Sequence, residues 1–458
     1  MIENVQEILN KQNEFFESGK TRDVNFRLEY LKKLKKNIIA KEKDILSALY
    51  TDLSKSELEA YATEIGTVLS ELSYMIKNTK RLSKTKYKLA PMSHFPGKLM
   101  ETRDPYGCVL VISPWNFPFQ LTLMPIIDAV AAGNTVICKP SKQAPAIKEV
   151  MKNLIAETFP QEYVTIISGG RDENADLLDL KYDYIFFTGS VNIGKYIMSK
   201  ATPNLTPVSL ELGGKSPCIV DKSCNLDVAV NRIVFGKFTN AGQICVAPDY
   251  LLVHDDIVDT FIEKVKSRIT EVYTNDPLSC AHLPKIINDR EFDRVISLID
   301  PEKVVFGGKY NKSIRKIEPT IMKGVTLDDK VMSMEIFGPI MPIITFNDHN
   351  KNLEIIEKHS RPLALYVFTE NKNVKDFYIK NVRYGGGCVN DTLMHTATHK
   401  IGFGGVGYSG IGQYHGKHGF DTFTHYKGIV DSATWMDMQA RYLPATKSKM
   451  ATIKLAMK

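Results

Sequence analysis

Residues 109–116 (VLVISPWN) and 135–142 (TVICKPSK) decide the fold, because each is a short apolar run that ends abruptly in turn-forming and polar residues. Three further runs have the same form, and stretches with helical spacing separate all five. The predicted strands are Val109–Ser113, Thr135–Lys139, Val164–Ile167, Tyr184–Phe187 and Val208–Glu211. Strands that alternate with crossover helices predict an open, largely parallel sheet in an α/β protein.

A ligand site is expected along one edge of this sheet, because ligands bind beyond the carboxyl ends of parallel strands. The residues at those positions are rich in Gly, Pro and polar side chains. They are Pro114–Asn116, Pro140–Lys142, Ser168–Gly170, Thr188–Gly189 and Leu212–Gly214.

Helices and a second α/β region flank the predicted sheet. Apolar residues recur at helical spacing between Val24 and Lys80, at Phe26, Leu31, Leu34, Ile38, Ile45, Leu49, Leu58, Ile65, Leu69 and Leu72. The basic, proline-containing stretch Arg81–Arg103 has no helical period and predicts an extended arm. From about Leu212 to Asn390 the pattern predicts two helices, Leu226–Phe238 and Val258–Tyr273, and four strands, Leu251–His254, Val304–Phe306, Ile340–Phe346 and Ala364–Thr369.

Composition excludes several classes of protein. The net charge of +7 comes from lysines scattered among glutamates, which is typical of solvated helix faces rather than of a nucleic-acid site. The seven cysteines are odd in number and contain no CxxC pair, so reduced thiols are expected rather than disulfides or a metal site. Met1–Phe16 is too charged for a signal peptide, and no apolar run approaches the roughly 20 residues that span a bilayer. A cytoplasmic protein is expected.

Two phosphate-binding motifs are present only in part. Gly405–Gly410 matches GxGxxG, but the following residues are too rich in glycine to begin a helix, so a loop over the domain interface is expected. Gly189–Tyr196 is one residue away from a Walker A loop. Tyr196 stands where Ser or Thr must bind magnesium, which excludes a nucleoside triphosphatase. The helix that follows can still present its amides to a phosphate.

Three residues stand out for their chemistry. Cys245 lies in a turn between a helix and a strand, where a lone cysteine is more often a core residue than a nucleophile. Glu211 ends a buried strand, where a carboxylate is costly unless it is paired or functional. Asn116 offers an amide donor at a strand end, although turn formation alone explains an asparagine there.

Taken together, six motifs in fixed order resemble those of aldehyde dehydrogenases, and the resemblance covers nearly the whole chain. The motifs are Trp115–Pro118, Phe187–Ser190, Leu210–Lys215, Gly242–Cys245, Glu335–Pro339 and Phe403–Gly410. The continuation through Tyr414–His418 and the short N-terminal region are similar to the class 3 branch, which includes fatty and aromatic aldehyde dehydrogenases.

The resemblance implies roles for the three residues. Cys245 would attack the aldehyde, after activation of a thiol whose ordinary pKa is about 8.5. The side-chain amide of Asn116 and the backbone amide of Cys245 would stabilise the resulting oxyanion. Glu211 would act as general base on the water that hydrolyses the thioester.

The resemblance also implies a nicotinamide cofactor, either NAD or NADP. Lys139 resembles the lysine that contacts the ribose, and the turn Thr188–Gly194 would face the pyrophosphate. The remaining residues implied to contact the cofactor are Trp115, Gly189, Ser190, Gly194, Glu335 and Phe337.

One position departs from the family's pattern. Relatives that prefer NAD commonly have Lys-Pro-Ser-Glu after this strand, whereas this chain has Lys139–Lys142, with lysine in place of the acid. Lys142 removes a carboxylate that would repel a 2′-phosphate, so we predict that NADP is accepted. The alternative, in which Lys142 points to solvent and NAD is used, stays open.

The implied organisation is a cofactor-binding domain (1–210, with the arm 81–103 inserted), a catalytic domain (211–390) and a tail (391–458). The tail would close the domain interface and contribute to a homodimer. Two other functions stay open. A CoA-acylating relative would release the thioester to CoA, which needs no base such as Glu211. A non-catalytic protein of the same fold would not need Cys245, Glu211, Asn116 and Lys139 together.

Overall fold

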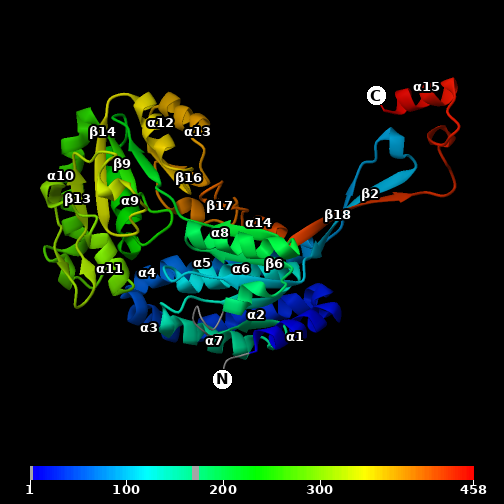
Figure 1. The fold of residues 1–458 in the computed structure, drawn as a ribbon, viewed down its shortest axis with the longest axis horizontal. Helices are drawn as coiled ribbons and strands as arrows, with labels where there is room; N and C mark the ends of the chain where they lie inside the picture. Colours follow the sequence, from blue (N-terminus) through cyan, green and yellow to red (C-terminus); the bar gives the residue numbers. More distant parts are fainter. Residues whose placement is uncertain (1–3, 168–174, 458) are drawn as a thin grey trace.

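The computed structural model describes residues 4–167 and 175–457. Two large sheets with their helices form the body of the protein, and a three-stranded sheet projects from it (Figure 1). The predicted strand-end segment Ser168–Gly170 lies outside the described residues.

The first sheet has the strand order β17-β7-β6-β3-β4-β5. All five predicted strands are present and pair in parallel, as β3 (Cys108–Ile112), β4 (Thr135–Lys139), β5 (Val164–Ile166), β6 (Tyr184–Thr188) and β7 (Val208–Glu211). The chain winds outward from β3 to β4 and β5, then crosses to β6 and β7. The switch point therefore lies between the carboxyl ends of β3 and β6, where such folds bind ligands.

A sixth strand, β17 (Gly410–Ile411), was not predicted. It lies in the glycine-rich segment for which a loop was expected, and it pairs antiparallel with β7, with Gly410 opposite Glu211. A strand of two residues is too short to show the alternation by which strands are identified in a sequence. Its pairing covers β7, which would otherwise be the edge of the sheet.

An N-terminal helical layer packs beside this sheet. It consists of α1 (Val5–Glu17), α2 (Val24–Ala40), α3 (Glu42–Leu53), α4 (Glu57–Ala60), a π-helical turn (Tyr61–Ile65) and α5 (Gly66–Leu82). Most of the predicted core positions are buried, with Leu31, Leu34 and Ile38 fully so. The prediction that Leu58 is a core residue was wrong, since 81% of its surface is exposed. The short α4 and the π-helical turn interrupt the 3.6-residue period on which that prediction depended.

Three further helices belong to the same region: α6 (Pro118–Ala132), α7 (Pro145–Thr158) and α8 (Val191–Ala201). Almost every residue of α6 is buried, because it lies between the sheet and the N-terminal layer. Its first residues follow Asn116 directly.

The second sheet has the order β10-β13-β14-β9-β8-β15-β16. Its strands are β8 (Pro217–Val220), β9 (Tyr250–His254), β10 (Val304–Phe306), β13 (Thr320–Lys323), β14 (Ile340–Phe346), β15 (Ala364–Phe368) and β16 (Gly386–Val389). The four predicted strands are present, whereas β8, β13 and β16 were missed. The associated helices are α9 (Leu226–Phe238), α10 (Val258–Tyr273), α11 (Asp289–Ile296), α12 (His349–Lys358) and α13 (Lys372–Asn381), and α9 and α10 have the predicted bounds.

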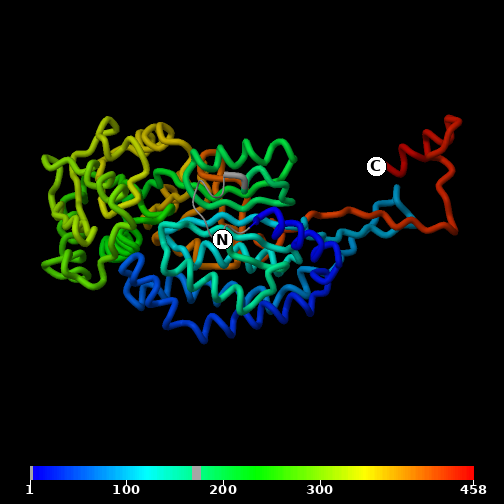
Figure 2. The backbone as a smooth tube through the Cα atoms, turned by 60° about the horizontal axis from the view of Figure 1, so that its bottom comes forward, coloured from blue at the N-terminus to red at the C-terminus, as the bar shows by residue number. Residues whose placement is uncertain are grey.

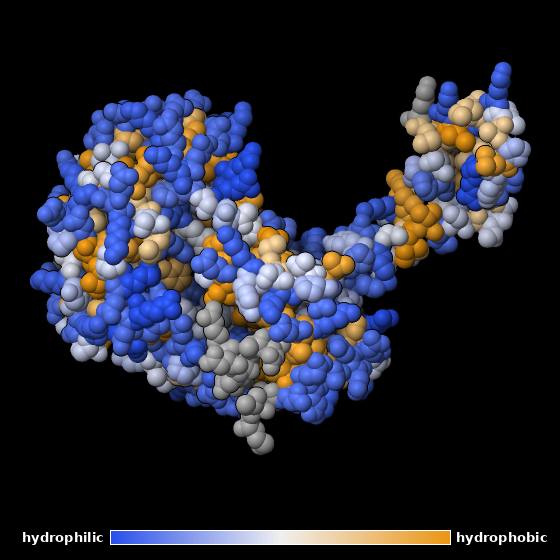
Figure 3. Space-filling view, viewed as in Figure 1, coloured by the Kyte–Doolittle hydropathy of each residue, from blue (hydrophilic) through white to orange (hydrophobic). Residues whose placement is uncertain are grey.

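The projecting arm is built from two segments that lie far apart in the sequence. Strand β2 (Gly97–Pro105) pairs on one side with β1 (Lys86–Lys88) and on the other with β18 (Thr424–Ser432), which follows α14 (Gly416–Thr422). Figure 2 shows the two long segments side by side, leaving the body together. Beyond them lies α15 (Lys447–Ala456). The arm carries exposed apolar side chains, among them Tyr87, Leu89, Phe95, Val430 and Trp435 (Figure 3).

Helices α1–α15, as far as their residues are described, include none that is long and apolar enough to cross a membrane.

Candidate functional site

Strand ends bring the predicted residues together at the switch point. In the register of the first sheet, Ile112 of β3 lies beside Lys139 of β4, and Thr188 of β6 lies beside Glu211 of β7. Asn116 follows β3 by four residues. Because the strands are parallel, these side chains share one edge of the sheet.

Cys245 reaches this edge on a loop with unusual backbone geometry. Three consecutive residues have left-handed conformations, with φ of 50° at Asn240, 52° at Ala241 and 74° at Gly242. A Cβ on Gly242 would lie 2.3 Å from the carbonyl oxygen of Gly338, so this position requires glycine. Non-glycine residues are costly in such conformations and persist only where their surroundings hold them.

Buried hydrogen bonds hold this loop. The Gln243 side-chain amide donates to the carbonyls of Asn240 (2.9 Å) and Lys285 (3.1 Å), and its oxygen accepts from the Ile287 amide (3.1 Å). The backbone amide of Asn240 donates to the Glu59 carboxylate at 2.7 Å. The conformation of the loop is therefore held by the segment that precedes α11 and by the N-terminal layer.

Asn116 is bonded directly to the cysteine loop. Its side-chain Nδ2 donates to the Gln243 carbonyl at 3.1 Å, and its own carbonyl accepts from Asn240 Nδ2 at 2.8 Å. A primary amide has two N–H groups. One is used in this bond, which leaves the other to donate to an oxyanion formed near Cys245.

The environment of Cys245 keeps its thiol protonated. Burial is the largest cause that raises the pKa of Cys245 to about 12, and the nearby Glu335 and Glu211 act in the same direction, whereas the backbone amides of Cys245 and Val246 act in the opposite direction. A reactive thiolate therefore requires positive charge to enter the site.

Glu211 is a buried carboxyl group, 2% exposed, with no hydrogen-bond partner for either oxygen among residues 4–167 and 175–457. Burial raises the pKa of Glu211 well above its usual value. Both oxygens are thus free to bind an incoming water, and the neutral acid is the favoured form until a polar molecule enters.

Glu335, Phe337 and Trp115 offer groups suited to the nicotinamide half of a cofactor. A Cβ on Gly213 would lie 2.2 Å from Oε2 of Glu335, so the Glu335 carboxylate rests on bare backbone. Oε1 of Glu335 has no partner in the described part of the chain, and Phe337 meets Trp115 edge to face at 5.4 Å. Burial raises the pKa of Glu335 to about 8, with the charge of Asp249 acting in the same direction. An unpaired acceptor beside an aromatic wall fits a ribose and its ring.

The turn Thr188–Gly194, predicted to face a pyrophosphate, joins the end of β6 to the start of α8. Thr188 ends β6, Ser190 precedes the first turn of α8, and Thr188 Oγ1 has no partner within the described segments. Lys139 is half-buried at the end of β4. Its pKa is lowered by burial and by the positive charges of Lys142 and Lys148, although Cys138 opposes this. Lys142 itself is exposed.

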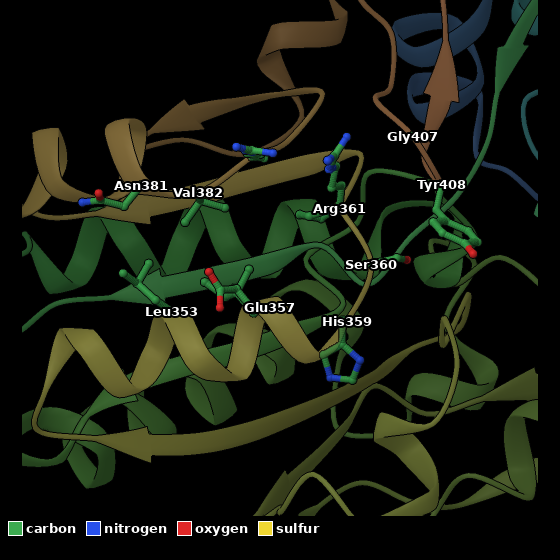
Figure 4. A pocket seen from close by; sticks show the side chains of 12 residues that line it. Leu353, Glu357, His359, Ser360, Arg361, Asn381, Val382, Gly407 and Tyr408 are labelled. Atoms are coloured by element: carbon green, nitrogen blue, oxygen red, sulfur yellow. The ribbon is translucent and has the colours of Figure 1, made fainter.

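A separate cavity of about 680 Å³ lies between α12, the end of α13 and the glycine-rich segment. Figure 4 shows His359, Arg361 and Tyr408 around it. None of the predicted site residues lines this cavity.

Side chains from the N-terminal layer were missed at this site. Lys55 and Glu64 contact the Asn116 segment, and Glu59 contacts the cysteine loop. They lie in a helical stretch with many charged residues, so only the three-dimensional packing distinguishes them from solvated groups. No group of three or more His, Cys, Asp or Glu side chains that could hold a metal ion occurs in residues 4–167 and 175–457.

Comparisons with known proteins show the family and the fold. A model described as the aldehyde dehydrogenase family matches residues 2–429. The 4,4′-diaponeurosporen-aldehyde dehydrogenase of Staphylococcus aureus is 46% identical, over 97% of each chain. The mouse protein named "Aldehyde dehydrogenase, dimeric NADP-preferring" is 40% identical, over 98% of this chain and 99% of its own. The solved substrate-bound state of Staphylococcus aureus AldH has a TM-score of 0.97 at 45% identity and covers 99% of both chains.

Proposed function

Since the chain belongs to the aldehyde dehydrogenase family and is an NAD(P)-dependent aldehyde dehydrogenase, we propose that Cys245, Asn116 and Glu211 carry out its reaction. The observation that carries this proposal is the bond from Asn116 Nδ2 to the Gln243 carbonyl, two residues before Cys245. It joins the loop of an amide donor to the loop of a buried thiol beside an unpaired carboxyl group.

In the first half of the reaction the Cys245 thiol loses its proton to water, the thiolate attacks the aldehyde carbon, and the carbonyl oxygen becomes an oxyanion. The free N–H of the Asn116 side chain and the backbone N–H of Cys245 stabilise that charge, at roughly 3 kcal/mol for each donor in comparable sites. Loss of a hydride from the aldehyde carbon then leaves a thioester on Cys245. The oxidised nicotinamide, when bound, supplies positive charge beside Cys245 and accepts a hydride. Glu335, Phe337 and Trp115 would hold its ribose and ring, and Lys139 with Thr188, Gly189, Ser190 and Gly194 its remaining parts.

In the second half a water molecule attacks the thioester. Glu211 takes a proton from this water and so makes it a stronger nucleophile. The carboxylic acid then leaves, and the Cys245 sulfur is free again. Neither carboxylate oxygen of Glu211 has a partner to displace before the water binds, as far as the chain is described.

Alkylation tests the assignment of the nucleophile. Treatment with iodoacetamide in the presence of oxidised cofactor should modify Cys245 first, and activity should fall in parallel with that modification, measured by peptide mapping and rate assays on the same samples. Full turnover after complete modification of Cys245 would exclude it as the nucleophile. Cys224, which is also half-buried, serves as the internal control thiol.

Cofactor choice depends on the lysines after β4. We propose that NADP is accepted because Lys142 places a cation where a carboxylate would repel the 2′-phosphate. Lys142→Glu should shift the ratio of kcat/KM for NADP and NAD several-fold toward NAD, since one exposed charge contact contributes only about 1 kcal/mol. Both constants are measured in the wild type and the variant. A wild type that strongly prefers NAD, with no change in Lys142→Glu, would leave Lys142 without a role.

The domain organisation and assembly are proposed on the same basis. The first sheet supports a cofactor-binding domain at 1–210 and the second a catalytic domain at 211–390, with 391–458 as the closing and oligomerisation segment. The exposed apolar side chains of the arm support a homodimer, which light scattering of the purified protein distinguishes from a monomer. A cytoplasmic location is supported by seven cysteines that are all unpaired.

A further inference from the structure

A buried ion pair of the N-terminal layer lies directly behind Asn116. Lys55 follows α3 and Glu64 lies in the π-helical turn, and both side chains are completely buried with Nζ 2.5 Å from Oε1. Removing two charges from water costs about as much as their attraction returns, so such a pair is weak evidence for a stabilising role. The contacts that the pair makes with neighbouring backbone groups therefore say more about its role than the attraction between the two charges.

The pair binds the segment that follows β3 at both ends. Lys55 Nζ donates to the Asn116 carbonyl at 3.0 Å, and it lies 4.0 Å from the centre of the Phe117 ring. Oε2 of Glu64 accepts from the backbone amides of Phe119 (2.8 Å) and Gln120 (3.2 Å), at the start of α6. Residues 116–120 are thus attached to the pair through three backbone groups.

The same carbonyl links this segment to the nucleophile loop. The backbone oxygen of Asn116 accepts from Lys55 Nζ and from Asn240 Nδ2. Asn240 is the first of the three left-handed residues before Cys245. A shift of the Asn116 backbone carbonyl would therefore move the amide donor relative to the loop that carries the thiol. Oxyanion donors act only within a few tenths of an ångström of their position, and a misplacement of 1 Å can cost about 100-fold in rate.

We propose that Lys55 and Glu64 are positioning residues for acylation, which hold Asn116 so that its free amide N–H points at the oxyanion formed on Cys245. This inference rests on the role proposed above for Asn116. It assigns to the N-terminal layer a part in the reaction, although no side chain of that layer touches the reacting atoms in this assignment.

A double-mutant cycle tests the inference. Lys55→Met with Glu64→Gln removes both charges together, which avoids an unpaired buried charge, and the glutamine side chain keeps an oxygen for the amides of Phe119 and Gln120. The pair of substitutions is made in the wild type and in Asn116→Ala, and the rate of the pre-steady-state burst of reduced cofactor is measured. We expect a loss of about 10- to 100-fold in the wild type and of less than about threefold in Asn116→Ala.

Two controls separate positioning from general stability. Lys41→Met with Glu157→Gln removes a half-exposed Lys–Glu pair between the N-terminal layer and α7, 2.9 Å apart, and should leave the burst unchanged. Lys55→Arg keeps the ion pair but places a wider group against the Asn116 carbonyl. It should lower the burst rate at least several-fold in protein that still unfolds in one cooperative thermal transition, and it tests the positioning role if the double variant does not fold.

Equal losses in both backgrounds, or a wild-type burst rate in Lys55→Arg, would overturn the positioning role and leave the proposed function intact. An Asn116→Ala enzyme with an unchanged burst rate would overturn the proposed role of Asn116, and the positioning role with it.

Discussion

Cys245→Ala is expected to lower the rate of aldehyde oxidation by about 10⁴-fold or more, because the covalent intermediate on which hydride transfer depends is formed on this sulfur. Removal of one buried sulfur leaves a small cavity, so the variant should remain folded. Binding of NAD and NADP should be almost unaffected. The measurements are steady-state rates with an aliphatic and an aromatic aldehyde, and titration of cofactor binding by fluorescence.

The matched controls are Cys224→Ala and Cys388→Ala, which remove the other half-buried thiols. Both variants should keep near-wild-type turnover, since neither residue lies in a matching motif or beside Glu211. Turnover in Cys245→Ala within tenfold of the wild type would contradict the whole mechanism, including the roles of Asn116 and Glu211.

Glu211→Gln separates the two halves of the reaction. Acylation needs no base on the water, so one equivalent of reduced cofactor should still appear in a burst. Steady-state turnover should then fall by about 10²- to 10⁴-fold, because the thioester is hydrolysed without general-base assistance. Rapid mixing measures the burst, and mass spectrometry of the stalled enzyme should show the acyl group on Cys245.

The pH dependence of deacylation in the wild type follows from the buried carboxyl group of Glu211. Burial raises the pKa of Glu211 above its usual value near 4.5, so the carboxylate that acts as base is populated progressively as the pH rises. Deacylation by the wild type should therefore accelerate toward alkaline pH, and Glu211→Gln should lose that dependence. A variant with wild-type turnover at every pH would exclude the role of base.

Stability distinguishes this role from a purely structural one. The unfolded chain ionises Glu211 near pH 4.5, whereas the folded protein keeps the proton, so this group lowers the stability of the folded state as the pH rises above that value. Glu211→Gln should consequently be at least as stable as the wild type at pH 7. A structural carboxylate predicts the opposite, and thermal melts compare the two. Glu318→Gln, at another buried glutamate, is the matched control.

The sequence predicted those parts of the fold that have a strong local pattern. The strands β3 to β7 end in glycine, proline or polar residues, and the helices α9 and α10 show continuous helical spacing, so their bounds were predicted closely. The strands β16 and β17 consist largely of glycine and have no alternation to detect. Their existence depends on neighbouring strands, which local patterns do not contain.

The candidate site was predictable in its motifs and not in its supports. Cys245, Glu211 and Asn116 lie at strand ends or in a glycine-containing turn, where function leaves a local signal. Lys55 and Glu64 lie in a charged helical stretch, and the residue type alone does not show whether a charged side chain is buried or exposed. Only the packing of that layer against α6 shows that both are withdrawn from water.

The pairing of β2 with β18, and of β7 with β17, has a consequence for how the chain is made. Both partner strands lie far behind β2 and β7 in the sequence, so they leave the ribosome long after the strands with which they pair. Until then a nascent chain presents two incomplete sheet edges, and such edges pair readily with other chains. Contacts between residues so far apart in the sequence also form slowly, because a very long loop must close first. The sheet edges at β2 and β7 therefore gain their last partners late in folding, and until then they are open to pairing with other chains.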